Sequence, residues 1–166
     1  LGEGGEVAIP EGVTEIGSFA FENCTTLTKV TMPDSVIKIE ESAFASCTNL
    51  ENVVFSSNLK EIGLSSFQDC GLITIEFPDS LEIIGDSAFD NCTNITGDLI
   101  IPDSVSKLGN AAFRNCSSLD GILKISNSLT EIQDATFLNC EKLKGELIIP
   151  DSVTSIGAMA FSSCKG

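Results

Sequence analysis

Residues 149–164 read IPDSVTSIGAMAFSSC, and residues 9–24, which lie 140 positions earlier, read IPEGVTEIGSFAFENC. The same motif recurs between these two stretches, and the seven Cys of the chain mark each recurrence. The Cys are Cys24, Cys47, Cys70, Cys92, Cys116, Cys140 and Cys164, at intervals of 23, 23, 22, 24, 24 and 24 residues. Regular spacing along a whole chain is typical of a repeat array.

Other residue types keep the same register as the Cys. A Phe stands three residues before every Cys, as Phe21, Phe44, Phe67, Phe89, Phe113, Phe137 and Phe161. Five residues before each Phe, and again three residues further back, the chain carries Ile, Leu or Val. Each unit therefore presents the same apolar positions, and we expect these positions to face a common core.

A short stretch of alternating residues opens each unit. These stretches are residues 7–9, 30–32, 53–55, 75–77, 99–101, 123–125 and 147–149. The outer two positions are always apolar, whereas the middle position varies between residues as different as Glu76 and Ile100. Alternation with a period of two predicts a half-buried β-strand. Pro follows five of the seven stretches and indicates where a strand ends, because Pro has no amide hydrogen to donate to a ladder.

The rest of each unit is expected to hold a second extended stretch and a short helical one. The residues after the Pro alternate again, as in SVTSIG at residues 152–157. The Phe-centred segment, such as DSAFDNC at residues 86–92, has room for one or two helical turns. Ser18, Asp86, Asn110 and Asp134 are candidates to cap the start of such turns.

One unit of this size has too few apolar side chains to offset the conformational entropy lost on ordering its backbone. Stacked units share buried faces and strand hydrogen bonds, so an array folds where a single unit does not. The motif therefore recurs because each coil must present the same inner surface to its neighbours.

The pattern IPDSVTSIGAMAFSSC is preceded by the motif L..L.IP, in which each dot stands for any residue and the final IP is the start of the pattern. Together they resemble the BspA-type leucine-rich repeats of bacterial cell-surface proteins. The resemblance covers residues 7–164 in seven registers, and its departures are local. Ser56 and Ser126 replace the Pro, Glu40 and Gln133 replace a Gly, and one residue is missing after Cys70.

The resemblance implies an α/β fold, a leucine-rich repeat right-handed solenoid of about seven coils of 22–24 residues, with short parallel strands plus short helical turns. It also implies a secreted or surface protein of host-associated bacteria with a role in adhesion. We expect residues 1–166 to be a single array and a fragment of a longer surface protein, because the motif runs to both ends without polar capping units.

Composition excludes several classes of function. The net charge is −15, from 24 acidic and 9 basic residues, so nucleic acid is not an expected partner. No apolar run approaches the ~18 residues needed to cross a bilayer, so we expect no membrane insertion in this segment. His is absent, which removes the commonest general base and the commonest metal ligand. A Cys nucleophile would have no His to activate it, and we expect no enzymatic activity and no cofactor.

The Cys column has three interpretations: buried free thiols, disulfides or a metal site. Equivalent side chains in a parallel ladder point the same way rather than at each other, and no pair has the CxxC spacing of a zinc site. Buried free thiols are therefore favoured.

An acidic column follows the strands, as Glu11, Asp34, Ser57, Asp79, Asp103, Asn127 and Asp151. One interpretation is that these carboxylates bind calcium. Turn residues that bond to their own backbone are the favoured interpretation.

The outward-facing strand positions are the candidate binding site for a protein ligand, either a host extracellular protein or another cell-surface protein. The candidate residues are Asn52, Val54, Glu76, Asp98, Ile100, Ile122, Lys124, Glu146 and Ile148. We expect them to lie on one continuous sheet face. The side that carries Phe19 and Met159 is the alternative surface, and a structural spacer that presents another domain away from the cell wall is the alternative function.

Overall fold

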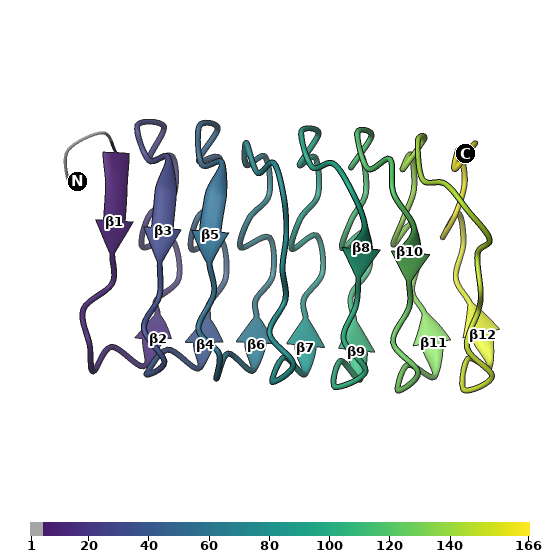
Figure 1. The fold of residues 1–166 in the computed structure, drawn as a ribbon, viewed down its shortest axis with the longest axis horizontal. Helices are drawn as coiled ribbons and strands as arrows, with labels where there is room; N and C mark the ends of the chain where they lie inside the picture. Colours follow the sequence, from purple (N-terminus) through teal and green to yellow (C-terminus); the bar gives the residue numbers. More distant parts are fainter. Residues whose placement is uncertain (1–4) are drawn as a thin grey trace.

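The computed structural model describes residues 5–166. These residues form a parallel β-solenoid, with one coil for each of the seven Cys-centred units. The coils are stacked in a single row from the N-terminal to the C-terminal end (Figure 1). We number them 1 to 7 in chain order, so that coil 4 is the one that contains Cys92.

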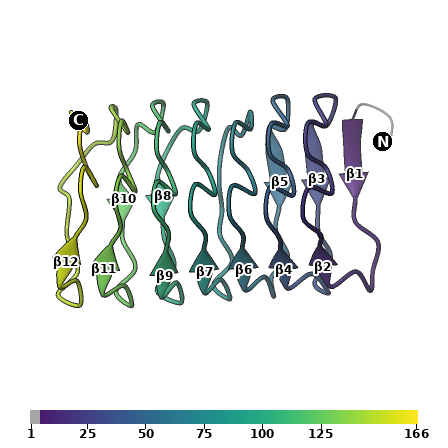
Figure 2. The same cartoon turned by 180° about the vertical axis from the view of Figure 1, so that it is seen from behind.

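Each coil has two strand positions, and these build two columns along the array. The first column contains β1 (Glu6–Ala8), β3 (Lys29–Thr31), β5 (Asn52–Val54), β8 (Leu99–Ile100) and β10 (Leu123–Lys124). The second column contains β2 (Glu15–Ile16), β4 (Lys38–Ile39), β6 (Glu61–Ile62), β7 (Ile83–Ile84), β9 (Lys107–Leu108), β11 (Glu131–Ile132) and β12 (Ser155–Ile156). Strands of the two columns run in opposite directions, so each coil passes along the first column and returns along the second (Figure 1, and from behind in Figure 2).

Paired strands are parallel and join equivalent residues of successive coils. Val7 pairs with Val30, and Val30 pairs with Val53. The second extended stretch predicted from the sequence is confirmed as the second column. The first stretch is confirmed as a strand in five of the seven units. It is wrong for residues 75–77 and 147–149, which form no strand.

The Phe-centred segments form hydrogen-bonded turns, and residues 5–166 contain no α-helix, so the expected helical turns are wrong. The backbone N–H groups alternate between two kinds of acceptor. In coil 1, Phe19 and Phe21 donate to carbonyls of coil 2, whereas Ala20 and Glu22 donate to the residue three positions back. Phe19 and Asn23 have left-handed φ values of 60° and 57°. An α-helix is impossible here because every second amide is used between coils.

Two of the four proposed helix caps, Asp86 and Asp134, act between coils instead. The carboxylate of Asp86 accepts the backbone N–H of Asn110 at 2.8 Å, and that of Asp134 accepts the N–H of Ala158 at 2.6 Å. Each acceptor lies one coil before its donor. These side chains therefore stabilise the stacking of coils rather than the start of a helix.

The Phe column is a continuous stack through the core. Successive rings from Phe21 to Phe161 lie 5.1 to 5.9 Å apart between centroids, with ring planes within 12° of parallel. The five central rings are fully buried, namely Phe44, Phe67, Phe89, Phe113 and Phe137. The expected common core is confirmed.

The Cys column lies beside the Phe stack, and all seven thiols are free. From Cys47 to Cys164, each thiol donates to the carbonyl of the Phe in the preceding coil, with sulfur–oxygen distances of 3.0 to 3.3 Å. Burial raises the pKa of Cys92 and of Cys140 to about 12. The thiols fill space and satisfy a carbonyl, as expected of buried free Cys.

The first column is interrupted at coil 4, so the sheet predicted to be continuous is not. On the N-terminal side Met32 N–H donates to Val54 C=O at 2.9 Å, and on the C-terminal side Ile101 N–H donates to Lys124 C=O at 2.9 Å. Within the described chain, the equivalent amides of Phe55 and Phe77 have no backbone acceptor in the next coil. The column therefore splits into the sheets β1-β3-β5 and β8-β10.

Two aromatic side chains explain the interruption. Phe55 and Phe77 stand in successive coils at a position where the other coils have Ile or Met. Their centroids are 6.1 Å apart, which is wider than the ~4.8 Å spacing of paired strands. Each ring packs edge-on against the Phe stack, Phe55 on Phe67 and Phe77 on Phe89. Within the described chain, Ile125 N–H likewise has no acceptor at Ile148 C=O, the bond equivalent to that from Ile101 to Lys124, so residues 147–149 form no strand.

Replacement of Phe89 by Ala should lower the free energy of unfolding by about 3–5 kcal/mol, because it removes a buried ring between two stacked neighbours. Urea unfolding followed by circular dichroism measures this loss. Phe19→Ala is the matched control, because Phe19 is 51% exposed and Ala111 holds the equivalent position with φ 52°. A loss for Phe89→Ala no larger than that of the control would show that the stack contributes little.

Thiol labelling of the folded protein at pH 8 should modify Cys24 and Cys164, which are only partly buried, and spare the five between them. Burial keeps those five out of contact with the reagent, and it raises the pKa of Cys92 and of Cys140 to about 12. Absorbance with an aromatic disulfide reagent counts the reactive groups, and all seven should react in denaturant. Fast native labelling of Cys92 or Cys116 would contradict the core assignment.

The amides of Ile75 and Phe77 should exchange with deuterium at least ~100-fold faster than that of Ile101, because only Ile101 donates to an adjacent strand. Nuclear magnetic resonance measures the rates residue by residue. Ile9, which donates to Thr31 at 2.9 Å, is a second protected reference. Equal protection at Ile75, Phe77 and Ile101 would mean that the ladder is continuous in solution.

Candidate partner-binding face

The first column turns alternate residues of each coil toward solvent, as Asn52 and Val54 in coil 3. Successive side chains of an extended chain point to opposite sides. Ile100 is accordingly 41% exposed, whereas its neighbours Leu99 and Ile101 are buried. The outward positions form a row along the array, which we call the strand face.

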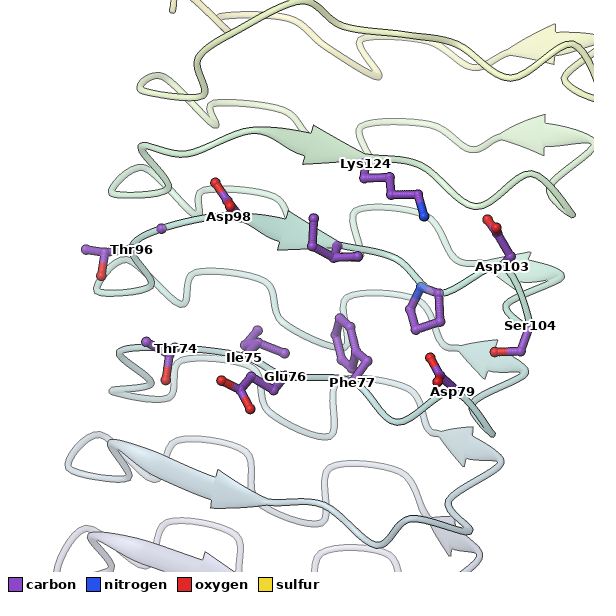
Figure 3. Close-up of a pocket in the computed structure, with 13 residues that line it drawn as sticks. Thr74, Ile75, Glu76, Phe77, Asp79, Thr96, Asp98, Asp103, Ser104 and Lys124 are labelled. Atoms are coloured by element: carbon purple, nitrogen blue, oxygen red, sulfur yellow. The ribbon is translucent and has the colours of Figure 1, made fainter.

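Three hollows follow one another along the strand face. The central hollow has a volume of about 670 Å³ and lies between coils 4 and 5 (Figure 3). A second hollow of about 520 Å³ lies between coils 3 and 4, and a third of about 280 Å³ lies between coils 6 and 7. Glu76 borders the first two hollows, and Lys124 borders the central and third hollows. The three hollows therefore form one connected row.

All nine candidate residues are exposed and line these hollows. Asn52, Val54 and Glu76 line the hollow between coils 3 and 4. Glu76, Asp98, Ile100 and Lys124 line the central hollow. Ile122, Lys124, Glu146 and Ile148 line the hollow between coils 6 and 7. The structure brings the nine residues to one face, and their role in binding stays a prediction.

Several residues of the central hollow are absent from the sequence-based candidate site. These residues are Phe77, Asp79, Pro102, Asp103 and Ser104. They lie at or after the ends of the strand stretches, where the sequence pattern predicts core or turn positions. The signals that mark this place in the sequence are the shortest Cys interval, 22 residues from Cys70 to Cys92, and the successive Phe residues of coils 3 and 4.

The central hollow is strongly acidic. Four carboxylates line it, those of Glu76, Asp79, Asp98 and Asp103, together with the single ammonium group of Lys124 (Figure 3). In the part of the chain that the structure describes, the side chains of Glu76 and Asp79 have no hydrogen-bond or ion-pair partner, and Lys124 forms no ion pair. The charges of this hollow are therefore largely uncompensated.

The other two carboxylates of the hollow hold the next coil in place. Asp98 accepts the backbone N–H of Ile122 at 2.9 Å, and Asp103 accepts that of Asn127 at 3.0 Å. The backbone and side-chain amides of Asn127 keep the pKa of Asp103 below its ordinary value. The interpretation that residues of the acidic column bond to their own backbone is wrong for Asp103, because its donors lie one coil further on.

The strand face also carries exposed aliphatic side chains toward its C-terminal half. Ile122 is 49% exposed and Ile148 is 68% exposed, and both border the hollow between coils 6 and 7. The alternative surface does not form a single patch, because Phe19 lies in coil 1 and Met159 in coil 7, at opposite ends of the row.

The structure describes the surroundings of the acidic and Cys side chains. Among residues 5–166, no group of three or more Cys, Asp or Glu side chains is arranged to hold a metal ion. The pKa of Cys116, like that of Cys92, is raised well above its ordinary value by burial, which opposes the thiolate form needed for a nucleophile. The same residues contain no helix long and apolar enough to cross a membrane.

The chain is similar to several solved bacterial structures. A leucine-rich repeat protein from T. pallidum shares 32% identity, with a TM-score of 0.91 over 99% of this chain and 78% of that one. A leucine-rich repeat protein from Eubacterium ventriosum shares 26% identity, with a TM-score of 0.82 over 96% of this chain and 43% of that one. A leucine-rich cell surface protein from Faecalibacterium prausnitzii shares 27% identity, with a TM-score of 0.54 over 96% of this chain and 51% of that one.

Among curated proteins no sequence matches this chain. The family model for the BspA type leucine rich repeat region, however, matches residues 5–96 and 49–166 in six copies. The two matched segments overlap and together span the described chain. The coil-by-coil register of Phe and Cys, the parallel solenoid and the family match agree, and the chain belongs to the BspA-type leucine-rich repeat family.

Proposed function

We propose that this array is a non-enzymatic protein-binding module of a bacterial cell-surface or secreted protein, and that it contributes to adhesion to host proteins or to other cells. One observation carries the proposal. The buried positions repeat from coil to coil, whereas the outward position of the strand face changes, as between Thr31, Glu76 and Lys124. A surface that varies on a constant scaffold is suited to recognition.

The shape and polarity of the strand face support a protein ligand. Solenoids use extended faces of this kind for binding. The connected hollows give relief to the face, and Ile100, Ile122 and Ile148 place aliphatic side chains beside charged ones. Trp and Tyr, which anchor many tight interfaces, are absent from the chain, so the affinity is expected to be moderate.

The surface location is inferred from similarity. The F. prausnitzii structure is that of a cell surface protein. This chain spans 51% of that protein and 43% of the E. ventriosum protein, so the role of the whole protein is part of the proposal.

A spacer is the second candidate function. The single row of coils, held by hydrogen bonds and ring stacking along most of its length, favours a stiff rod that could hold another domain away from the cell wall (Figure 1). A spacer needs no variable face, and this is the property that separates the two candidates.

The proposed function is tested by immobilising the protein and measuring the binding of purified extracellular-matrix proteins and of whole bacterial cells. At least one of them should bind at micromolar concentration. The double variant Ile100→Glu with Ile148→Glu should then weaken binding at least ~10-fold, because it places charge on the aliphatic part of the strand face. The fold should be retained, since Glu76 already occupies the equivalent position in coil 4.

The matched control is Ile37→Glu with Leu64→Glu, which changes two exposed aliphatic residues away from the strand face. Glu82 and Glu41 hold the equivalent positions in other coils, so this variant should fold as well. Equal binding by both variants and the unchanged protein would remove the strand face as the site. No binding to any ligand would favour the spacer.

A further inference from the structure

We propose that the central hollow recognises a basic, extended segment of the partner protein and seats an Arg or Lys side chain between coils 4 and 5. This inference rests on the proposed function and specifies the chemistry of the partner. It follows from three properties of the hollow, namely its unpaired backbone groups, its uncompensated carboxylates and its apolar wall.

The interrupted ladder leaves hydrogen-bonding groups available at the hollow. Where the ladder is intact, Leu99 N–H donates to Ile122 C=O at 2.9 Å. The equivalent bond from Ile75 N–H to Asp98 C=O is not formed, nor is the bond from Phe77 N–H to Ile100 C=O. Carbonyls at such an edge accept hydrogen bonds from a ligand, and a guanidinium group carries five donors.

The hydroxyl of Ser104 shows that coils 4 and 5 are also separated at the end of the central hollow, in the turn that follows Pro102. Its counterparts Ser80 and Ser152 each donate to a Leu carbonyl of the preceding coil at 2.7 Å. The Oγ of Ser104 is shielded from solvent by the protein and has no hydrogen-bond partner. Ser104 lies at the end of the hollow beside Asp79 and Asp103 (Figure 3). A polar group of the ligand would satisfy this oxygen.

The charge of the hollow selects a cationic group. Glu76 and Asp79 approach it from coil 4 without partners of their own, and Asp98 and Asp103 add negative charge from coil 5. Lys124 is the one opposing charge among the lining residues, so an anionic ligand would meet net repulsion. Charge complementarity of this kind determines which partner binds and speeds its association.

The wall of the hollow fits a long side chain rather than a bare ion. Phe77, Ile100 and Pro102 offer apolar surface between the carboxylates, and the methylene stem of an Arg or Lys can pack there while its head reaches the acids. Two of the four carboxylates already accept backbone N–H groups.

An inserted strand does not fit between the coils. Coils 3 and 4, and coils 4 and 5, remain stacked through the Phe column at 5.3 Å between centroids. A strand placed between two coils would need about twice the ~4.8 Å strand spacing. The partner segment must therefore lie across the strand face and extend only a side chain into the hollow.

The test uses a fluorescein-labelled peptide of alternating Val and Arg, seven residues long, and its counterpart in which Glu replaces Arg. Fluorescence anisotropy at low salt measures binding to the whole protein. The Arg peptide should bind at least ~10-fold more tightly than the Glu peptide and should weaken as salt rises, because the interaction is largely electrostatic.

The variant Glu76→Lys with Asp79→Asn should weaken binding of the Arg peptide at least ~10-fold. Both substitutions introduce residues that the array already carries at equivalent positions, Lys124 and Asn127, so the fold is preserved. The matched control, Glu131→Lys with Glu41→Gln, makes the same change in net charge away from the strand face. It should alter binding by no more than about twofold.

Equal weakening by the two variants would show that the peptide senses only net charge, and the inference would fail. Similar affinity for the Arg and Glu peptides, or no binding of either at millimolar concentration, would also overturn it. None of these results removes the proposed function, which fails separately if the unchanged protein binds none of the extracellular-matrix proteins or bacterial cells.

Discussion

The hydrogen bond between equivalent residues of successive coils is the interaction on which this structure depends. The Phe turns join every pair of successive coils through backbone hydrogen bonds, and the second column joins coils 1 to 5 and coils 6 and 7. A coil alone has no partner for these groups and too small a core to offset the loss of conformational entropy. Repetition of sequence is the consequence, because a side chain that disturbs the register in one coil also disturbs its neighbours.

The same constraint determines which residues each position accepts. Alternate amides of the Phe turn are used between coils, so the chain must adopt left-handed φ values at two positions per turn. Ser, Asn, Asp and Ala hold most of these positions, and Asn and Asp tolerate this conformation comparatively well. The Phe rings stack with the coil spacing, and the thiol of each Cys reaches a Phe carbonyl of the preceding coil.

The strand face is where the repeat is least strict, and both proposals are located there. Its outward side chains take part in no core contact and are free to vary. At coil 4, Phe55 and Phe77 widen the first column beyond the spacing of a ladder, while the Phe stack remains in contact and β7 stays paired with β6 and β9. The strands fail to pair on this one face while the other contacts between the coils hold. This local failure produces the central hollow and its unsatisfied polar groups.

The sequence by itself determined the coil number, the identity of the core columns and the outward direction of the nine candidate residues, because these depend only on the period of the repeat and on alternation along a strand. The tertiary structure decided three further features. It replaced the expected helical turns with stacked turns, since the amides that a helix needs are taken by the next coil. It turned Asp86, Asp98 and Asp103 into links between coils. It opened the first column at coil 4, because the width of two packed Phe rings and the spacing of neighbouring coils are properties of the assembled array and are not visible in any single repeat.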